Sequence, residues 1–149
     1  MKKSTISWIW MFVFFANVAF AQRGPGPAKE RIEAMKVGFI TQKVNLSAEE
    51  AQKFWPVYNK YSDEQEKLRK SFRGMMMDEL RDMDNMTDAE ADKTLNEMIN
   101  FRTAEVELTK KYVAEFKKVL PSKKVVLLFK AEQEFKRELL KKLKDQQGR

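Results

Sequence analysis

Ser47-Ala48-Glu49-Glu50 decides where the first long helix of this chain begins, and Thr87-Asp88-Ala89-Glu90 repeats its pattern further along. In each segment a hydroxyl residue is followed three positions later by Glu. This is the capping box, in which the hydroxyl and the Glu side chain each accept a hydrogen bond from a free amide at a helix start. Leu120-Pro121-Ser122 interrupts the chain a third time, because proline cannot continue a helix interior.

These three boundaries predict four helices, at residues 29–44, 48–82, 88–119 and 122–144. The segment shows no strand-like alternation and is rich in Glu, Lys, Leu, Met, Ala and Gln, which favour helix. The expected fold class is therefore all-α. At 1.5 Å per residue the two central helices would each be about 45–50 Å long. Pro56 is expected to bend the second helix and not to end it.

Three of these helices carry narrow apolar stripes at heptad-like spacing. The stripes comprise Phe54, Tyr58, Tyr61, Leu68, Phe72, Met75, Leu80 and Met83 in the second helix, Leu95, Ile99, Val106, Val113, Phe116 and Leu120 in the third, and Val125, Leu128, Phe135, Leu139 and Leu143 in the fourth. A long, thin helical hairpin buries little surface per residue. We therefore expect an elongated four-helix hairpin that completes its core as a homodimer, the alternative being a closed monomeric four-helix bundle.

The first 21 residues have the pattern of a secretory signal peptide. Lys2 and Lys3 precede an apolar run over residues 6–20, and Ala19-Phe20-Ala21 is an A-x-A cleavage signature. Cleavage after Ala21 would leave residues 22–28 as a flexible leader and 29–149 as a single helical domain. The alternative is a retained membrane anchor, although the run is shorter than the roughly 20 residues that span a bilayer. The expected compartment is the periplasm of a Gram-negative bacterium.

Composition narrows the chemistry. The chain has neither His nor Cys, so the commonest general base, the commonest metal ligand and any disulfide or lipoprotein anchor are absent. No nucleophile–base pair has a distinctive spacing, and we expect no enzyme activity. Setting aside Lys2 and Lys3 leaves 27 of the 29 Lys and Arg against 22 Asp and Glu, a net charge of +5. In the periplasm this balance indicates acidic protein surfaces or anionic lipid as partners, and not nucleic acid.

Methionines crowd the expected end of the central hairpin. Met75, Met77, Met83 and Met86 are candidate Cu(I) ligands, with Met98 expected across from them, because thioether sulfur is soft and prefers Cu(I). The competing interpretation is that methionines fill irregular gaps near a hairpin tip. Three consecutive methionines also cannot all point one way, since helix neighbours are about 100° apart. No other cofactor is expected.

The same region carries a mixture of positive charge and apolar side chains. The candidate client-binding residues are Arg69, Lys70, Phe72, Arg73, Met76 and Arg81. Charge would attract an unfolded protein, and adaptable apolar side chains would then engage it.

Two further groups have a structural and a functional interpretation. The aromatic group at residues 54–61 either packs against the first and fourth helices or leaves a contact surface around Trp55. The basic run Lys136, Arg137, Lys141, Lys142 and Lys144 is either a solvated face or a contact for anionic lipid headgroups or an acidic partner.

Two segments, residues 40–61 and 119–140, resemble the small secreted helical proteins labelled periplasmic heavy-metal sensor or sensor of ECF-type sigma factor, a group similar to the wider Spy/CpxP family. The mark of that family is a pair of L-T-x-x-Q motifs that open two helices. Here Leu46, Ser47 and Glu50 correspond to the first motif, with Glu in place of Gln. Leu120 alone corresponds to the second, where Lys124 occupies the position of Gln.

The resemblance implies an all-helical hooked hairpin, a cradle-shaped dimer and a role in envelope stress. The role would be ATP-independent binding of unfolded envelope proteins. The alternative is a sensor of metal or misfolded protein that signals to an inner-membrane anti-sigma factor or sensor kinase. The absence of His argues against nickel, cobalt or zinc sensing through imidazole ligands.

Overall fold

The structure of the protein is a computed structural model that describes residues 26–147. Over these residues the chain is all-α, as predicted: it forms α1 (Pro27–Val44), α2 (Ala48–Glu79), the 3₁₀ helix η1 (Leu80–Asn85), α3 (Asp88–Val119) and α4 (Ser122–Gln147), with no strand. The predicted signal peptide, residues 1–21, lies outside the described residues, as does the leader up to residue 25.

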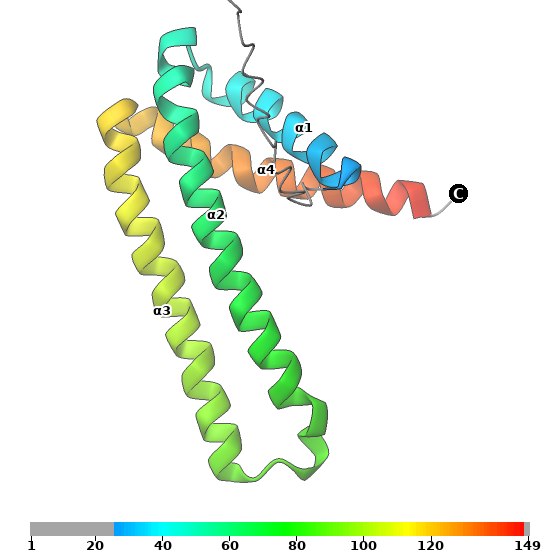
Figure 1. The fold of residues 1–149 in the computed structure, drawn as a ribbon. Coiled ribbons are helices and arrows are strands. Elements are labelled where there is room, and N and C mark those ends of the chain that lie inside the picture. The colour runs from blue at the N-terminus through cyan, green and yellow to red at the C-terminus, as the bar shows by residue number, and fades with distance from the viewer. Residues whose placement is uncertain (1–25, 148–149) are drawn as a thin grey trace, which may run out of the picture.

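The helices form two pairs that lie at an angle to one another (Figure 1). Helices α2 and α3 lie side by side as a long antiparallel hairpin. Helices α1 and α4 lie side by side near the open end of that hairpin and extend away from it as an arm. This is the hooked outline expected from the resemblance. We call α2 with α3 the hairpin, and α1 with α4 the arm.

Both predicted capping boxes are present. The Ser47 hydroxyl accepts from the Glu50 amide at 3.2 Å, and the Glu50 carboxylate accepts from the Ser47 amide at 2.8 Å. Thr87 and Glu90 make the equivalent pair of bonds at 3.3 and 2.8 Å. Each box satisfies amides that a helix start leaves without an intrahelical partner. The second and third helices therefore begin at the predicted residues.

Three predicted boundaries were wrong. Helix α1 begins at Pro27, inside the expected leader 22–28, because proline lacks only an amide hydrogen that the first turn does not use. Helix α2 ends at Glu79 and not at residue 82, and the chain tightens into η1 before the turn. Helix α4 continues to Gln147. Helix α2 continues through Pro56, so this proline does not end the helix, as expected.

The core lies where the arm meets the hairpin. Its largest fully buried side chains are Ile40 and Val44 from α1, Phe54 from α2, Phe116 from α3 and Leu128 from α4. The aromatic group of α2 packs here. Its ring partners on the hairpin are Phe116, which the sequence placed in the apolar stripe of the third helix, and Tyr112, which it did not. All four helices therefore contribute to one cluster.

The distal half of the hairpin is packed differently from the prediction. Leu95, Ile99 and Val106, expected in the core stripe of α3, are more than half exposed, and Thr94 is buried instead. The face of α3 that meets α2 is displaced by about one residue from the most apolar one, which leaves that apolar face uncovered. Met83 is likewise 65% exposed and Leu80 and Leu143 are both 44% exposed, so their assignment to core stripes was wrong.

Candidate functional site

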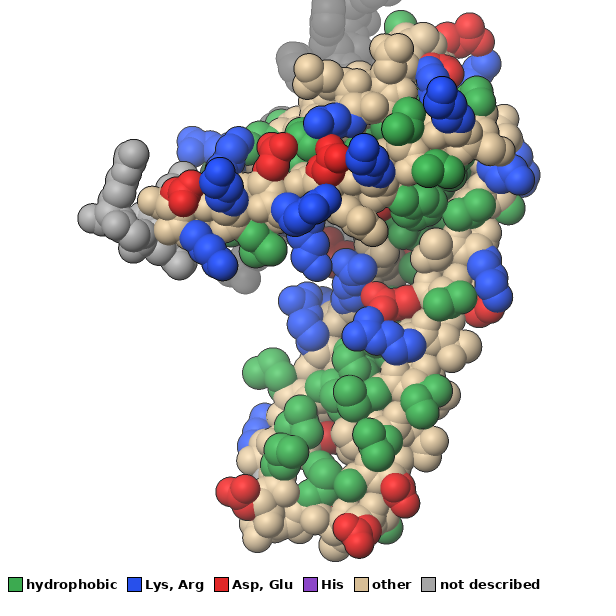
Figure 2. Space-filling model, turned by 180° about the vertical axis from the view of Figure 1, so that it is seen from behind, with side chains coloured by type: hydrophobic (Ala, Val, Ile, Leu, Met, Phe, Trp, Pro, Cys, Tyr) green, Lys and Arg blue, Asp and Glu red, His purple; other side chains and the backbone are tan. Residues whose placement is uncertain are grey.

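An open cavity lies in the angle between the arm and the hairpin. It has a volume of about 620 Å³, and we call it the crook cavity. Lys36 of α1 and Lys136 of α4 reach it from the arm, and Arg69, Arg73 and Arg102 reach it from the hairpin. Figure 2 shows Lys and Arg side chains gathered in this angle, with hydrophobic side chains over the hairpin beyond it.

The crook cavity has more positively charged side chains than carboxylates. Its two carboxylates are already engaged: Glu105 binds Arg69 at 3.2 Å and Arg102 at 2.9 Å, and Glu66 binds Lys29 at 3.0 Å. Lys29 also lowers the pKa of Glu66, first by its hydrogen bond and then by its charge.

Three cations of the cavity remain without such a partner. Within the described part of the chain, Lys36, Arg73 and Lys136 have no carboxylate oxygen at ion-pair distance. The five basic side chains therefore leave a surplus of positive charge that faces solvent.

Two phenylalanines form the apolar part of the crook cavity. The rings of Phe72 from α2 and Phe101 from α3 are stacked at 4.0 Å between centroids and 7° between planes. Both side chains are only partly buried. The cavity thus places a flat aromatic surface beside its cations, an arrangement that suits ligands with both apolar and anionic groups.

A second cavity, which we call the arm cavity, adjoins the first and shares Lys36, Arg69 and Lys136 with it. Its volume is about 470 Å³. Its apolar walls come from the two arm helices and consist of Ile32, Phe129, Phe135 and Leu139.

Glu132 lies in the arm cavity and is the acidic group among its lining residues. Its carboxylate accepts a hydrogen bond from the Tyr58 hydroxyl at 2.9 Å, which connects α4 of the arm to α2 of the hairpin. Burial raises the pKa of Glu132, although the bond from Tyr58 and the charges of Lys36 and Arg69 act in the opposite direction. The raised pKa means that folding disfavours the ionised form of this carboxylate.

Replacing this carboxylate by an amide should stabilise the fold near neutral pH. Because the folded pKa of Glu132 lies above the ordinary 4.5, its contribution to stability falls as pH rises from about 4.5 through the folded pKa. Glu132→Gln should therefore raise the free energy of unfolding at pH 7 and have progressively less effect towards pH 4, as measured by urea titration at several pH values. Glu138→Gln, on the exposed face of the same helix, should show no such pH-dependent gain. A loss of stability at pH 7 in the Glu132 variant would contradict this account.

Only half of the predicted client-binding residues lie together in the structure. Arg69, Phe72 and Arg73 line the crook cavity together. Lys70, Met76 and Arg81 do not line it, and Arg81 pairs instead with Asp78 at 3.0 Å near the hairpin tip. The sequence analysis missed Lys36, Phe101, Arg102 and Lys136 as members of this site, since they come from three other helices.

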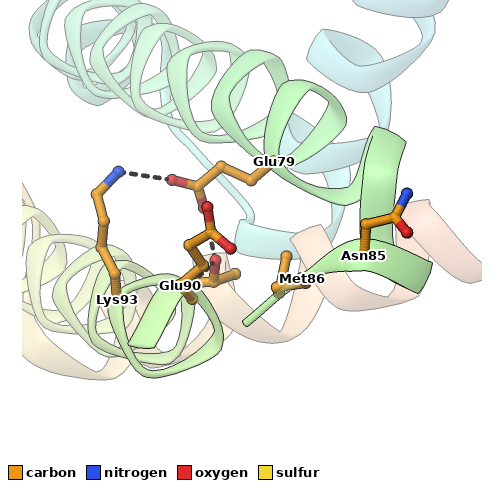
Figure 3. Close-up of a pocket in the computed structure, with 6 residues that line it drawn as sticks. Glu79, Asn85, Met86, Glu90 and Lys93 are labelled. Carbon is orange, nitrogen blue, oxygen red and sulfur yellow. Dashed lines mark hydrogen bonds and ion pairs between the residues drawn. The ribbon is translucent and has the colours of Figure 1, made fainter. Parts of the chain in front are cut away.

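A separate, smaller cavity of about 220 Å³ lies at the hairpin tip (Figure 3). Glu79 accepts from Lys93 at 3.2 Å and from the Thr94 hydroxyl at 3.0 Å, and Glu90 belongs to the Thr87 cap. These bonds join the end of α2 to the start of α3. The polar groups named here thus close the turn.

Of the four Cu(I) candidates, Met86 alone lines the tip cavity. Met77 and Met83 are 73% and 65% exposed, and Met75 is partly buried. In residues 26–147 there is also no group of three or more Asp or Glu side chains placed to hold a metal ion. The copper assignment remains a sequence-based prediction.

The four residues compared with the L-T-x-x-Q motif have structural roles. Ser47 caps α2, Leu46 packs partly buried against the core, and Leu120 is buried where α3 ends. Glu50, besides completing the cap, accepts from Lys124 of α4 at 2.6 Å, and Lys124 also donates to the Asn45 carbonyl at 2.7 Å. The fifth residues of the two motif-like segments therefore bind each other, which draws the starts of α2 and α4 together.

The other two sequence groups are also placed by the structure. Trp55 is partly buried and packs edge-on against Phe54 and Tyr58, with ring centroids 5.0 and 5.3 Å away. It belongs to the rim of the core. The basic residues of α4 from Lys136 to Lys144 are exposed, and of these Lys136 also lines the crook and arm cavities.

No protein-family model, curated protein or solved structure matches this chain. A search of the described helices for one long and apolar enough to cross a bilayer also found none.

Proposed function

We propose that this protein is a periplasmic, ATP-independent chaperone that holds unfolded or misfolded envelope proteins, and that it acts by binding and not by catalysis. The observation that carries the proposal is the crook cavity, where cations without a carboxylate partner lie beside the partly buried Phe72–Phe101 stack. Positive charge increases the rate of encounter with acidic segments of a client. Apolar contacts then retain the client weakly, because no single contact is strong.

The proposal extends to a homodimer. The support is the uncovered apolar face of α3, where Leu95, Ile99 and Val106 recur at spacings typical of helix-to-helix contacts and are each more than half exposed. An apolar stripe of this length on a single helix is otherwise a liability for aggregation. In the proposed dimer a second copy covers this stripe and leaves the crook cavity open.

The alternative is a sensor of metal or misfolded protein that signals to an inner-membrane anti-sigma factor or sensor kinase. What favours it is the resemblance of residues 40–61 and 119–140 to proteins with that label. The two functions differ in which proteins are bound. A chaperone should act on unrelated clients, whereas a sensor should bind one membrane partner specifically.

An aggregation assay tests the proposal. At molar ratios up to one to one, and without ATP, the protein should suppress light scattering by at least two unrelated unfolding clients. Serum albumin at equal mass serves as the control for crowding. Suppression that is absent at every ratio, together with specific binding to one membrane protein, would favour the sensor.

A further inference from the structure

The crook cavity and the arm cavity together have two chemically distinct ends. Lys36, Arg69 and Lys136 are common to both cavities. On the crook side they are joined by Arg73 and Arg102, and on the arm side the walls are the apolar side chains Ile32, Phe129, Phe135 and Leu139. A cationic zone therefore lies beside an apolar one in two adjoining cavities, which we call together the groove.

The cationic zone is suited to a compact anion. Lys36, Arg73 and Lys136 approach it from α1, α2 and α4, and none of them has a carboxylate at ion-pair distance within residues 26–147. Charged donors from three helices thus line one cavity, and phosphate oxygens are strong acceptors for such donors. Ser62 and Gln65, which also line the crook cavity, add uncharged donors.

The apolar zone is suited to a hydrocarbon chain. The arm cavity lies between α1 and α4, with Phe135 buried and Ile32, Phe129 and Leu139 partly buried along it. Beside these apolar walls the cavity is lined by Tyr58, Gln65, Gln133 and charged side chains. Apolar walls with convergent polar groups are typical of small-molecule sites of about 300–1,000 Å³. The carboxylate of Glu132 accepts a hydrogen bond from the Tyr58 hydroxyl, so one of its oxygens already has a donor within the arm cavity.

We propose that this groove binds a single-chain anionic lipid, with the phosphate headgroup held by Lys36, Arg73 and Lys136 and the acyl chain in the arm cavity. This site goes beyond client binding, and its test does not depend on whether the protein suppresses aggregation. The positive charge of the three cations favours an anionic headgroup. The apolar walls of the arm cavity favour a ligand that also has a hydrocarbon chain.

Dodecyl phosphate is the probe, used below the concentration at which it forms micelles and followed by isothermal titration calorimetry. Binding should be saturable at one molecule per chain. Affinity should rise from butyl to octyl to dodecyl phosphate by up to about fourfold per methylene group. Inorganic phosphate and the uncharged dodecyl maltoside should each bind far more weakly. Equal affinity for butyl and dodecyl phosphate would exclude the acyl-chain site.

Two matched variants locate the headgroup. Lys36→Gln with Lys136→Gln should weaken dodecyl phosphate binding by about tenfold or more, since charged hydrogen bonds are lost. Lys141→Gln with Lys142→Gln is the control, because it also removes two positive charges but from positions on α4 outside both cavities. It should change the affinity for dodecyl phosphate by less than about twofold. Circular dichroism should show both variants folded. Equal losses in the two variants would mean that net charge alone attracts the ligand and would overturn the proposal, as would equally tight binding of an acidic peptide without a chain.

Discussion

Phe116→Ala should lower the free energy of unfolding by about 3–5 kcal/mol, the range for truncating a fully buried phenylalanine. Phe116 is completely buried, and its ring lies 5.7 Å from those of both Phe54 and Tyr61. The truncation leaves a cavity at the point where the arm meets the hairpin. Because domains of this kind are stable by only about 5–15 kcal/mol, the loss is a large share of the total.

Urea titration followed by far-ultraviolet circular dichroism measures this effect, at one protein concentration for all variants. Val126→Ala is the matched control, because Val126 of α4 is 68% exposed and lies outside the proposed dimer contact. It should change the free energy of unfolding by no more than about 0.5 kcal/mol, as surface substitutions usually do. A loss below about 1 kcal/mol for the Phe116 variant would show that the aromatic cluster does not hold the helices together.

The second large effect concerns client capture. Arg69→Glu with Arg73→Glu should slow capture of an acidic unfolded client by about tenfold or more at low salt, because electrostatic steering accelerates association by 10–10³. The two substitutions reverse the charge at the hairpin side of the crook cavity. In the unsubstituted protein, added salt should have a similar effect, since exposed charges are screened over about 10 Å at 0.1 M.

Stopped-flow fluorescence with a labelled client gives the capture rate, and circular dichroism reports the fold. Lys141→Glu with Lys142→Glu makes the same change in net charge away from the cavity and should slow capture much less. Arg69 loses its ion pair with Glu105, but an exposed pair of this kind contributes at most about 1 kcal/mol, so the helices should remain folded. If the two double variants slow capture equally, the crook cavity is not the client site.

The helix starts were predictable because their causes are local. A capping box involves residues three positions apart, so Ser47 and Glu50, like Thr87 and Glu90, identify a helix start without knowledge of the rest of the fold. The end of α2 was not predictable in this way. The apolar pattern continues through Leu80 and Met83, yet the chain tightens into η1 to reach the turn before α3.

The orientation of α3 shows a different difficulty. Leu95, Ile99 and Val106 form a more apolar stripe than the face that contains Thr94 and Tyr112, so periodicity alone favours the wrong side. Thr94 can be buried because its hydroxyl donates to Glu79 across the hairpin. Tyr112 can be buried because its hydroxyl donates to Glu64 at 2.7 Å. Polar residues that find partners on another helix cannot be recognised from their own helix.

The candidate site was predicted in part for the same reason. Arg69, Phe72 and Arg73 lie within one turn of α2, and their spacing suggested a shared surface before the fold was known. Lys36 and Lys136 lie near opposite ends of the chain and come near these residues only because the arm and the hairpin meet at an angle that encloses the crook cavity. Nothing in the local sequence around either lysine distinguishes it from the other exposed lysines of the chain.

The position of the core at one end of the molecule implies that the two ends of the hairpin unfold with different ease. Near the arm, every helix contributes buried side chains, so amides there should exchange with solvent only when the whole domain opens. Towards the tip, Thr94 is the buried side chain of α3 and the neighbouring apolar residues are exposed. That half can fray and re-form while the core stays closed. The described chain thus has a stable end at the core and a less stable end at the hairpin tip, and the crook cavity lies between them.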